Sequence, residues 1–477
     1  MHRKLLSIVS AVAILGAAAG GGLVWQNASE RREVLRSAIP ARPDLSRFPP
    51  EFVNRLAAAE DLAKNGPDRQ EGIAELSELY HANGFYPEAI RCYRALVRAD
   101  SHNPQWLHRW AMLVANYGES SDAVLLWRFA EKLDAKYLPL RIHLADALLK
   151  LNRTDEANAE YEAVLKQDPD NAYARLGLAR IGSAQNRWSD AKNLLEPTSH
   201  GSNVAIGSDL LVTVYDHLGL TAQADALRSQ NKAAGAFVDI PDPWMDALND
   251  ACFDSYRLSL IGGEADHRGN PRDAEKFLLR AESYAPNDGS ISFQLGQHYS
   301  ALKQYAQAES FFQKTTQLVP ELSDGWVQLV ETERALHHSS GAVNALLEGL
   351  RLCPLSPALH LQMASARLAA GDTTEAEKEF RESIRLRPEE AEAHLQLAQM
   401  LFGEEKVDEG LSEVRAALRA EPDFPPALST LAFYWISSGK ENEAAEALRK
   451  VRAQPRITRA DRQRLEDAFT QRFGHTL

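Results

Sequence analysis

Cysteine is scarce in this chain of 477 residues, which contains Cys92, Cys252 and Cys353 and no others. Their number is odd, no two are close in sequence, and none is followed by the histidine of a haem-attachment motif. The sequence therefore predicts neither a disulfide framework nor attached haem. Buried thiols within helices explain Cys92 and Cys353, and a single disulfide from Cys252 stays open as an alternative.

Catalytic signatures are also lacking. The sequence has no H-E-x-x-H helix, no glycine loop that would cradle a phosphate and no nucleophile-elbow serine. Its 14 histidines are scattered without the spacing of metal ligands, and the adjacent His337 and His338 are expected in an exposed turn. We therefore expect no enzyme activity, no catalytic residues, no cofactor and no metal site.

Basic charge is in short supply where nucleic acid would need it. The net charge is −13, and residues 241–448 carry 34 acidic against 18 basic side chains, a balance of −16. Phosphate binding needs a basic stripe, and none runs through this region. Nucleic acid is therefore excluded as the main partner. The acidity indicates a solvated outer face, with an acidic docking surface as the alternative.

What the sequence does contain is a period of 34 residues. Proline recurs at positions 286, 320, 354, 388 and 422, and each proline ends a run of helix-forming sequence. With Ser255 as position 1 of the first unit, positions 8 and 20 are mostly small, and positions 7 and 24 are large and apolar. Small residues at two fixed phases are what two closely crossing helices need. Each unit is therefore predicted to be a hairpin of two amphipathic helices, with a break near position 15.

These phases are similar to those of the tetratricopeptide repeat (TPR) family. Trp326, Leu329, Ala342 and Pro354 stand where the family pattern has them, and six units share one register over residues 255–458. His360 and His394 share position 4 of neighbouring units, where packing between repeats is expected. A looser series comes first, and an early proline at position 197 makes it less regular. Its anchors are Ala89, Ala123, Ala157, Ala191 and Ala224.

The predicted fold is all-α: a TPR helical-hairpin superhelix, or α-solenoid, in two arrays, preceded by one transmembrane or signal helix. Each array needs a cover at its free end. The predicted parts are a signal anchor or signal peptide (1–30), a proline-rich spacer (31–50), a first array with a capping helix at Phe52–Ala63 (51–234), a linker with a lead-in helix from Trp244 to Tyr256 (235–254), a second array of six repeats (255–458), and a C-terminal capping helix (459–477).

The N-terminus predicts export. His2, Arg3 and Lys4 precede an uncharged stretch at residues 5–25, which is long enough to cross a bilayer as one helix. If the stretch is retained, the protein is a single-pass protein of the inner (cytoplasmic) membrane with its repeats on the outer, periplasmic side. If an A-x-A site is cleaved instead, the protein is secreted into the periplasm.

The TPR resemblance implies that the first helix of each hairpin lines a concave surface, with ligand contacts at positions 2, 5, 6, 9 and 12. Position 6 is glutamine in four consecutive repeats, and its neighbours at position 5 are apolar. The residues at position 6 are Gln294, Gln328, Gln362 and Gln396; those at position 5 are Phe293, Val327, Leu361 and Leu395; those at position 9 are Gln297, Glu331, Ser365, Gln399 and Phe433.

A row of amides suggests a function. A glutamine amide both donates and accepts, so a regularly spaced row can pair with the peptide groups of an extended chain. The alternative is that glutamine is a good helix former repeated by duplication. The charged clamp of chaperone-binding TPR domains is not expected, because Arg334 is the one cation at these phases.

We therefore predict an exported or membrane-tethered scaffold that binds a protein or peptide partner in the groove of the second array. The alternative is an assembly or maturation factor for exported proteins, such as c-type cytochromes, or for envelope polymers, which holds a substrate for a separate enzyme. The repeats leave no room for a catalytic domain.

Overall fold

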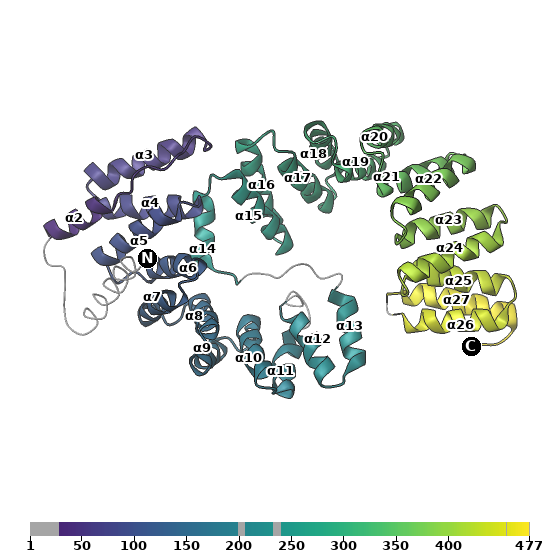
Figure 1. The fold of residues 1–477 in the computed structure, drawn as a ribbon, viewed down its shortest axis with the longest axis horizontal. Helices are drawn as coiled ribbons and strands as arrows, with labels where there is room; N and C mark the ends of the chain where they lie inside the picture. The colour runs from purple at the N-terminus through teal and green to yellow at the C-terminus, as the bar shows by residue number, and fades with distance from the viewer. Residues whose placement is uncertain (1–27, 199–205, 232–239, 455, 477) are drawn as a thin grey trace. The chain divides into compact units, whose positions relative to one another are not determined.

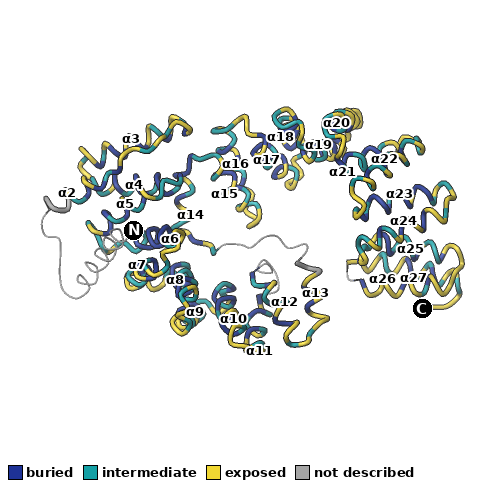
Figure 2. Tube along the Cα trace, in the orientation of Figure 1, coloured by how far each residue is buried: buried dark blue, intermediate teal, exposed yellow. Residues whose placement is uncertain are grey.

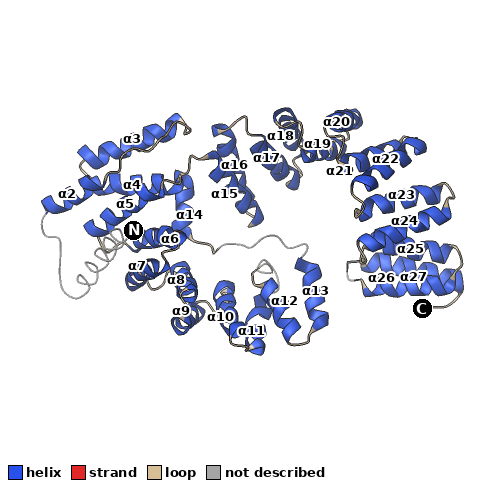
Figure 3. Cartoon of the chain, in the orientation of Figure 1, coloured by secondary structure: helices blue, strands red, loops and turns tan. Residues whose placement is uncertain are grey.

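The computed structural model describes residues 28–198, 206–231, 240–454 and 456–476. All regular secondary structure in these ranges is helical, with no strand (Figure 1, Figure 3), which confirms the all-α prediction. The predicted anchor or signal segment, residues 5–25, lies outside the described residues. None of the helices in the described ranges combines the length and the apolar character needed to cross a membrane.

The described residues form two compact units that divide between Ala285 and Pro286. In each unit, consecutive helices pair into hairpins that stack in chain order. The first unit contains α2 (Ala28–Ala38), α3 (Pro50–Asn65), α4 (Arg69–Ala82), α5 (Tyr86–Ala99), α6 (Pro104–Asn116), α7 (Ser120–Leu133), α8 (Leu138–Lys150), α9 (Thr154–Gln167), α10 (Ala172–Ala184), α11 (Trp188–Leu195), η1 (Glu196–Thr198), α12 (Ser208–His217), α13 (Thr221–Asn231), α14 (Pro243–Asp246), η3 (Ala247–Ala251), α15 (Ser255–His267) and α16 (Pro271–Tyr284).

The second unit continues the same pattern. Its successive first helices contact one another, α17 with α19, α19 with α21 and α21 with α23, so these helices share one face of the stack. The helices are α17 (Gly289–Ala301), α18 (Tyr305–Leu318), α19 (Ser323–Ala335), α20 (Ser339–Leu352), α21 (Pro357–Ala369), α22 (Thr373–Leu386), α23 (Ala391–Gly403), α24 (Val407–Ala420), α25 (Pro425–Ser437), α26 (Glu441–Ala453) and α27 (Arg459–Phe473).

Close crossing of the two helices in each hairpin explains the small residues of the repeat. A Cβ atom at Gly262, at position 8, would lie 2.6 Å from Leu278 Cγ and 3.2 Å from the Ala274 carbonyl oxygen. These neighbours occupy positions 24 and 20 of the same repeat. A Cβ atom at Gly296, at position 8 of the next repeat, would lie 2.5 Å from the Phe312 ring. The predicted crossing at positions 8 and 20 is therefore confirmed, and buried residues follow these helix contacts (Figure 2).

The turn within each hairpin also keeps the predicted register. Position 15 has a left-handed backbone in all six repeats after residue 255, with φ between +60° and +82°, although glycine fills it in three of them. The other three are Lys303, His337 and Glu405. A left-handed residue with a side chain costs roughly 1–2 kcal/mol, so packing of the hairpin rather than local preference holds this turn. The earlier array has the same turns at Gly84, Gly118, Asn152, Asn186 and Gly219.

Ring side chains at position 4 join one repeat to the next, as expected for His360 and His394. Trp326 Nε1 donates to the carbonyl of Pro320 at 2.8 Å, so the repeat-ending proline supplies an acceptor. The two histidines contact their preceding prolines in the same way and place the other ring nitrogen on a glutamate. These contacts are His360 with Pro354 (3.0 Å) and Glu379 (2.6 Å), and His394 with Pro388 (2.9 Å) and Glu413 (2.6 Å).

Residues 31–50 differ from the predicted spacer. Helix α2 covers part of the range, and Leu35, Ala38 and Phe48 are buried in the core of the first array. Prolines stop a helix from continuing but leave neighbouring apolar side chains free to pack. Arg42, in the stretch that follows α2, forms an ion pair with Glu60 of α3, in which Arg42 Nη2 lies 3.0 Å from Glu60 Oε2.

The two predicted capping helices are present as helices. Phe52, Leu56 and Ala63 of α3 are buried, and α3 packs on α4. Helix α27 contacts α25 and α26, and Thr458 accepts a hydrogen bond from the Asp461 backbone at its N-terminus. The early proline at position 197 leaves α11 with eight residues, so the first array is less regular, as expected.

The predicted lead-in helix from Trp244 to Tyr256 is wrong. The chain forms one turn of α-helix (α14), a 3₁₀ segment (η3) and an extended stretch at Cys252 before α15 begins. Asn83, at the end of α4, holds this stretch by accepting from Phe253 N and donating to the Ala251 carbonyl. These main-chain groups are therefore not available for a continuous helix. The preceding residues 232–239 of the predicted linker lie outside the described ranges.

Candidate functional site

The face shared by the first helices of the second unit carries the predicted glutamines. Gln294, Gln328, Gln362 and Gln396 lie one per helix on α17, α19, α21 and α23, and all four are half-buried. The repeat therefore brings them onto one face as predicted. Their partial burial places them between the packed core and solvent.

Hydrogen bonds within the chain already occupy three of the four amides. Gln328 Nε2 and Gln362 Nε2 both donate to Glu331, each at 3.2 Å, so this carboxylate joins neighbouring repeats. Gln396 donates to Glu392 and accepts from the Ser365 hydroxyl, each at 2.7 Å. The expected free ladder is thus a chain of contacts between repeats, because acidic and hydroxyl side chains lie within reach.

Two of the amide oxygens are unpaired within the described residues. Gln294 Oε1 and Gln362 Oε1 are buried and have no hydrogen-bond partner among the described residues. An unsatisfied buried acceptor costs roughly 1–3 kcal/mol. A donor supplied from outside, such as a peptide N–H, would recover part of this cost.

The apolar stripe at position 5 is only partly at the surface. Phe293, Val327 and Leu361 are half-buried, whereas Leu395 is 2% exposed and belongs to the hydrophobic core. The prediction that Leu395 lines a groove is therefore wrong, because α23 packs this side chain inward. At position 9, Gln297, Glu331 and Gln399 are exposed, and Phe433 exposes 59% of its surface.

Two cavities open near these position 9 residues. One, of about 630 Å³, is lined by Gln396, Gln399 and Met400 of α23 and by Ser365 and Leu368 of α21. The other, of about 690 Å³, lies between α25 and α27, and Gln399 lines it as well. The two cavities therefore adjoin on one face. Walls of the second cavity include Phe433, Pro425, Pro426, Leu465 and Ala468, with Arg456, Arg464 and Asp461 alongside.

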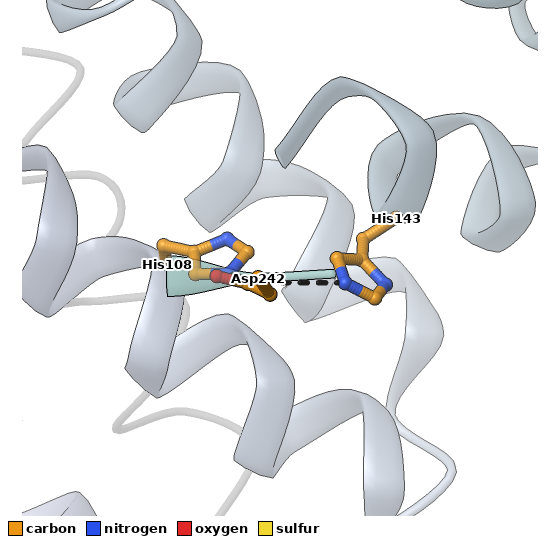
Figure 4. A group of neighbouring side chains, drawn as sticks. All are labelled: His108, His143 and Asp242. Atoms are coloured by element: carbon orange, nitrogen blue, oxygen red, sulfur yellow. Dashed lines mark hydrogen bonds and ion pairs between the residues drawn. The ribbon is translucent and has the colours of Figure 1, made fainter. Parts of the chain in front are cut away.

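A second constellation, missed in the sequence, lies inside the first unit (Figure 4). Asp242 Oδ2 lies 2.7 Å from His108 Nε2 and 3.4 Å from His143 Nε2, and Asp242 Oδ1 accepts from the Tyr137 hydroxyl at 2.5 Å. His108 and Asp242 are buried and 134 residues apart in sequence. The signal available was histidine and arginine at the ligand-contacting phases of the first array. With its alanine anchors at position 20, His108 is at position 5, and Arg109 and His143 are at position 6.

Two histidines and an aspartate invite comparison with a metal site. Trp127 Nε1–H, which can only donate, points at His108 Nδ1 at 3.0 Å, so Nδ1 is the acceptor nitrogen of the neutral ring. Nε2 then carries the proton and donates it to Asp242. A metal ligand needs that nitrogen unprotonated, so these residues fit a hydrogen-bonded network and do not fit a metal ion.

Burial and hydrogen bonding set the charges in this network. Burial by itself raises the pKa of Asp242, but the hydrogen bond from His108, with His143 and Tyr137 nearby, outweighs it and holds the pKa below its ordinary value. Burial lowers the pKa of His108, although Asp242 acts in the opposite direction. The network therefore contains a carboxylate facing a neutral imidazole near neutral pH.

His337 and His338 lie in the exposed turn between α19 and α20, as predicted. His338 Nδ1 lies 3.2 Å from Glu333 Oε2 and 3.8 Å from Glu309 Oε1. Burial and the neighbouring Glu309 raise the pKa of Glu333. Glu333 is buried and Glu309 is partly buried, whereas His338 is exposed, and these three side chains have ligand atoms close enough together to hold a metal ion.

Comparisons with known proteins agree with the hairpin architecture. Residues 153–200 and residues 361–425 match models of the tetratricopeptide repeat. Cellulose synthase 1 operon protein C of Komagataeibacter xylinus is 26% identical over 216 residues, which cover 40% of this chain and 16% of that protein. Stress-induced-phosphoprotein 1 of Caenorhabditis elegans is 29% identical over 136 residues, which cover 28% of this chain and 42% of that protein.

The chain thus spans less than half the length of these curated relatives. Among solved structures, the APC/C hetero-tetramer Cut9–Hcn1 has 12% identity and a TM-score of 0.39, over 89% of this chain and 99% of that one. One family match falls in each of the two predicted arrays, on helices α9 to α11 and on helices α21 to α24. The chain therefore contains tetratricopeptide repeats in these two ranges.

Proposed function

We propose that this chain acts as a binding scaffold, without catalysis of its own, and that the second unit holds an extended segment of a protein partner. The pair of adjoining cavities on one face of α21, α23, α25 and α27 carries this proposal. Their lining includes Gln396 and Gln399, two residues expected to contact a ligand, together with exposed Phe433. Apolar pockets spaced along a face with polar groups between them suit alternate side chains of an extended peptide.

We also propose that the protein is located outside the cytoplasm. Residues 5–25 supply the signal, either as a retained anchor in the inner membrane or as a peptide that is removed. N-terminal sequencing of the mature protein, combined with membrane fractionation, distinguishes the two. An intact N-terminus in the soluble cytoplasmic fraction would contradict export in either form.

A peptide-selection experiment tests the binding site. The full chain selects ligands from a displayed library of random peptides, and selected peptides are then titrated against Phe433→Ala and a matched control. The control is Leu347→Ala on α20, because Leu347 is 51% exposed and Phe433 is 59% exposed. Truncating a central aromatic contact typically costs about 2 kcal/mol or more, which is roughly 30-fold in affinity.

The expected result is that Phe433→Ala loses about 30-fold in affinity while Leu347→Ala binds as the unchanged chain does. Equal binding by all three proteins would show that this face is not the site. The fourfold replacement of the glutamines is a poorer test, because Gln328, Gln362 and Gln396 also join repeats through hydrogen bonds.

The second candidate is an assembly or maturation factor for envelope polymers or exported proteins. The similarity to cellulose synthase 1 operon protein C favours it, since that name belongs to a polymer-producing operon. In this case the second unit would hold a substrate or subunit for a separate enzyme. Deleting the gene should then abolish a polymer or cofactor-bearing product while the separate enzyme stays present, whereas a general scaffold would affect several unrelated complexes.

A further inference from the structure

Residues 240–253, here called the crossing segment, lie across the first helices of three consecutive hairpins in the first unit. The segment contacts Asn83 at the end of α4, His108 and Arg109 on α6, and Tyr137 and His143 at α8. Figure 1 shows its helix α14 beside α4 and α6. His108, Arg109 and His143 hold positions 5 and 6 of their repeats, the phases at which ligand contacts were expected in the second array.

One anchor of the crossing segment is a carboxylate. Asp242 is 4% exposed and accepts from His108 (Figure 4). The Tyr137 hydroxyl also donates to this side chain, as does Met245 N at 3.2 Å. A charged acceptor surrounded by aimed donors in a buried site binds more strongly and more selectively than a neutral group. Three donors therefore hold the Asp242 carboxylate at this point.

The second anchor is an aromatic side chain. The Trp244 ring stacks on Tyr137 with centroids 3.6 Å apart and planes inclined by 7°. The Trp244 backbone is held at both ends, since its N–H donates to the Tyr137 hydroxyl at 2.9 Å and its carbonyl accepts from Arg109 Nε at 3.0 Å. Arg109, 1% exposed, is itself oriented by Glu78, whose Oε1 lies 2.6 Å from Arg109 Nη1.

The third anchor recognises main chain. Asn83 donates to the Ala251 carbonyl at 2.8 Å and accepts from Phe253 N at 2.5 Å. A single side-chain amide thus pairs with both polar groups of the peptide backbone. This is the mode of recognition that the sequence suggested for glutamines in the second array.

Some side chains of the segment are buried against the array and others are exposed to solvent. Asp242, Leu248 and Phe253 face the array and are buried, whereas Pro241 and Pro243 are exposed. The segment therefore packs on the array through its buried side chains, and Ala251 and Phe253 join the hydrophobic core of the first array.

We propose that the first-helix face of α4, α6 and α8 is a peptide-binding site for a segment with aspartate, proline and an aromatic residue in succession. In this chain the crossing segment, with Asp242, Pro243 and Trp244, is the ligand in cis. A partner carrying the same three chemical groups competes for the site against a tethered ligand, whose effective concentration is in the range of about 1 mM for short connections. This inference concerns the first unit and does not depend on the function proposed for the second.

Direct binding in trans tests the proposal. The probe is a fluorescein-labelled synthetic peptide of residues 240–253, followed by fluorescence anisotropy. The receptors are the full chain and its Asp242→Ala/Trp244→Ala variant, in which two anchors of the tethered ligand are lost. A second peptide, carrying asparagine in place of Asp242, is the matched control for the carboxylate.

The peptide is expected to bind the double variant at least tenfold more tightly than the unchanged chain, because the tethered competitor is weakened. The asparagine peptide should bind the double variant about 10- to 100-fold more weakly, since hydrogen bonds to a charged group are lost. A folded double variant that ignores the peptide, or binds both peptides equally, would overturn the proposal.

Hydrogen exchange in the unchanged chain keeps the proposal testable if the double variant does not fold. A tethered ligand leaves its site by local opening, so the Trp244 and Phe253 amides should exchange at least tenfold faster than amides in α6. Exchange of both sets at one common rate would show that the crossing segment opens only with the whole array, which contradicts an exchangeable ligand.

Discussion

Replacing Asp242 with asparagine is the sharpest test of the buried network in the first unit. The carboxylate receives donors from His108 at 2.7 Å and from Tyr137 at 2.5 Å, one on each oxygen. Asparagine has nearly the same shape but one acceptor oxygen, so its NH₂ group must face one of these donors. The change removes the charge and one acceptor while leaving the packing volume almost unaltered.

The magnitude follows from these two losses. Hydrogen bonds to a charged group contribute about 1.5–3 kcal/mol and neutral ones about 1 kcal/mol, and a buried donor without a partner costs about 1–3 kcal/mol. Allowing for local rearrangement, the crossing segment should be weakened by about 2–4 kcal/mol. That loss corresponds to local opening on the order of 10²-fold more frequent.

Native-state amide hydrogen exchange measures this opening directly. The Trp244 amide, which donates to Tyr137, and the Phe253 amide, which donates to Asn83, report on the segment, and amides in α10 report on the array itself. Asp246→Asn is the matched control, because Asp246 is exposed and is the last residue of α14, the short helix that Asp242 caps at its N-terminus. A surface change of this kind should be within about 0.5 kcal/mol. An Asp242→Asn protein whose two amides exchange less than threefold faster would refute the reasoning.

Three further predictions follow from packing and titration. Gly262→Ala should destabilise the fold by about 1–3 kcal/mol through overpacking, because a Cβ at Gly262 would meet Leu278, whereas one at Gly263 would meet nothing within 4 Å. The thermal midpoint of Gly262→Ala should therefore be lower than that of Gly263→Ala. The hydrogen bond to Glu413 raises the pKa of His394. The contribution of His394 to folding stability is therefore complete below about pH 6.5 and is lost as pH rises through the raised pKa. His394→Gln should remove this pH dependence from the thermal midpoint. Burial lowers the pKa of His108. The contribution of neutral His108 to stability is therefore present above about pH 6.5 and declines as pH falls below that value. Hydrogen exchange of the Trp244 amide, corrected for intrinsic rates, should accelerate as pH falls below about 6.5.

The repeat register could be predicted from sequence because it rests on sterics that recur. The contact of Gly262 with Ala274 and Leu278 joins positions 8, 20 and 24 of one unit, and each of these positions is read directly from the 34-residue period. The left-handed turn at position 15 follows in the same way, although Lys303 and Glu405 show that glycine is not required there. The 34-residue period and short-range packing were therefore sufficient to predict the hairpin fold.

Contacts between residues far apart in sequence could not be predicted in this way. The crossing segment reaches residues far earlier in the sequence, such as Tyr137, 105 positions before Asp242, and Asn83, 170 positions before Phe253, and no periodicity relates them. The predicted spacer failed for a similar reason. Its four prolines indicated an extended chain, but Leu35 and Phe48 are apolar and pack into the hydrophobic core of the first array.

The glutamine row shows a different limit of prediction from sequence. The face on which the glutamines lie was predicted correctly, but the hydrogen bonds that occupy their amides were not. The period placed Gln328 and Gln362 on one face, as found. Whether their amides were free depended on rotamers of Glu331, which accepts from both at 3.2 Å. A side chain's hydrogen-bond partner depends on geometry at this scale, which a sequence pattern does not contain.

The contrast between Asn83 and these glutamines decides where binding energy in the second unit must come from. Asn83 follows the end of α4 and uses its whole amide on the peptide backbone. A peptide that used the amide of Gln328 or Gln362 would first have to break its bond to Glu331, and exchanging one hydrogen bond of about 1 kcal/mol for another gains little. The unpaired oxygens of Gln294 and Gln362 add acceptors without that cost, but they are buried and few. Affinity in the second unit should therefore come mainly from apolar contact around Phe433, which is why that side chain, and not the glutamine row, is the decisive position to change.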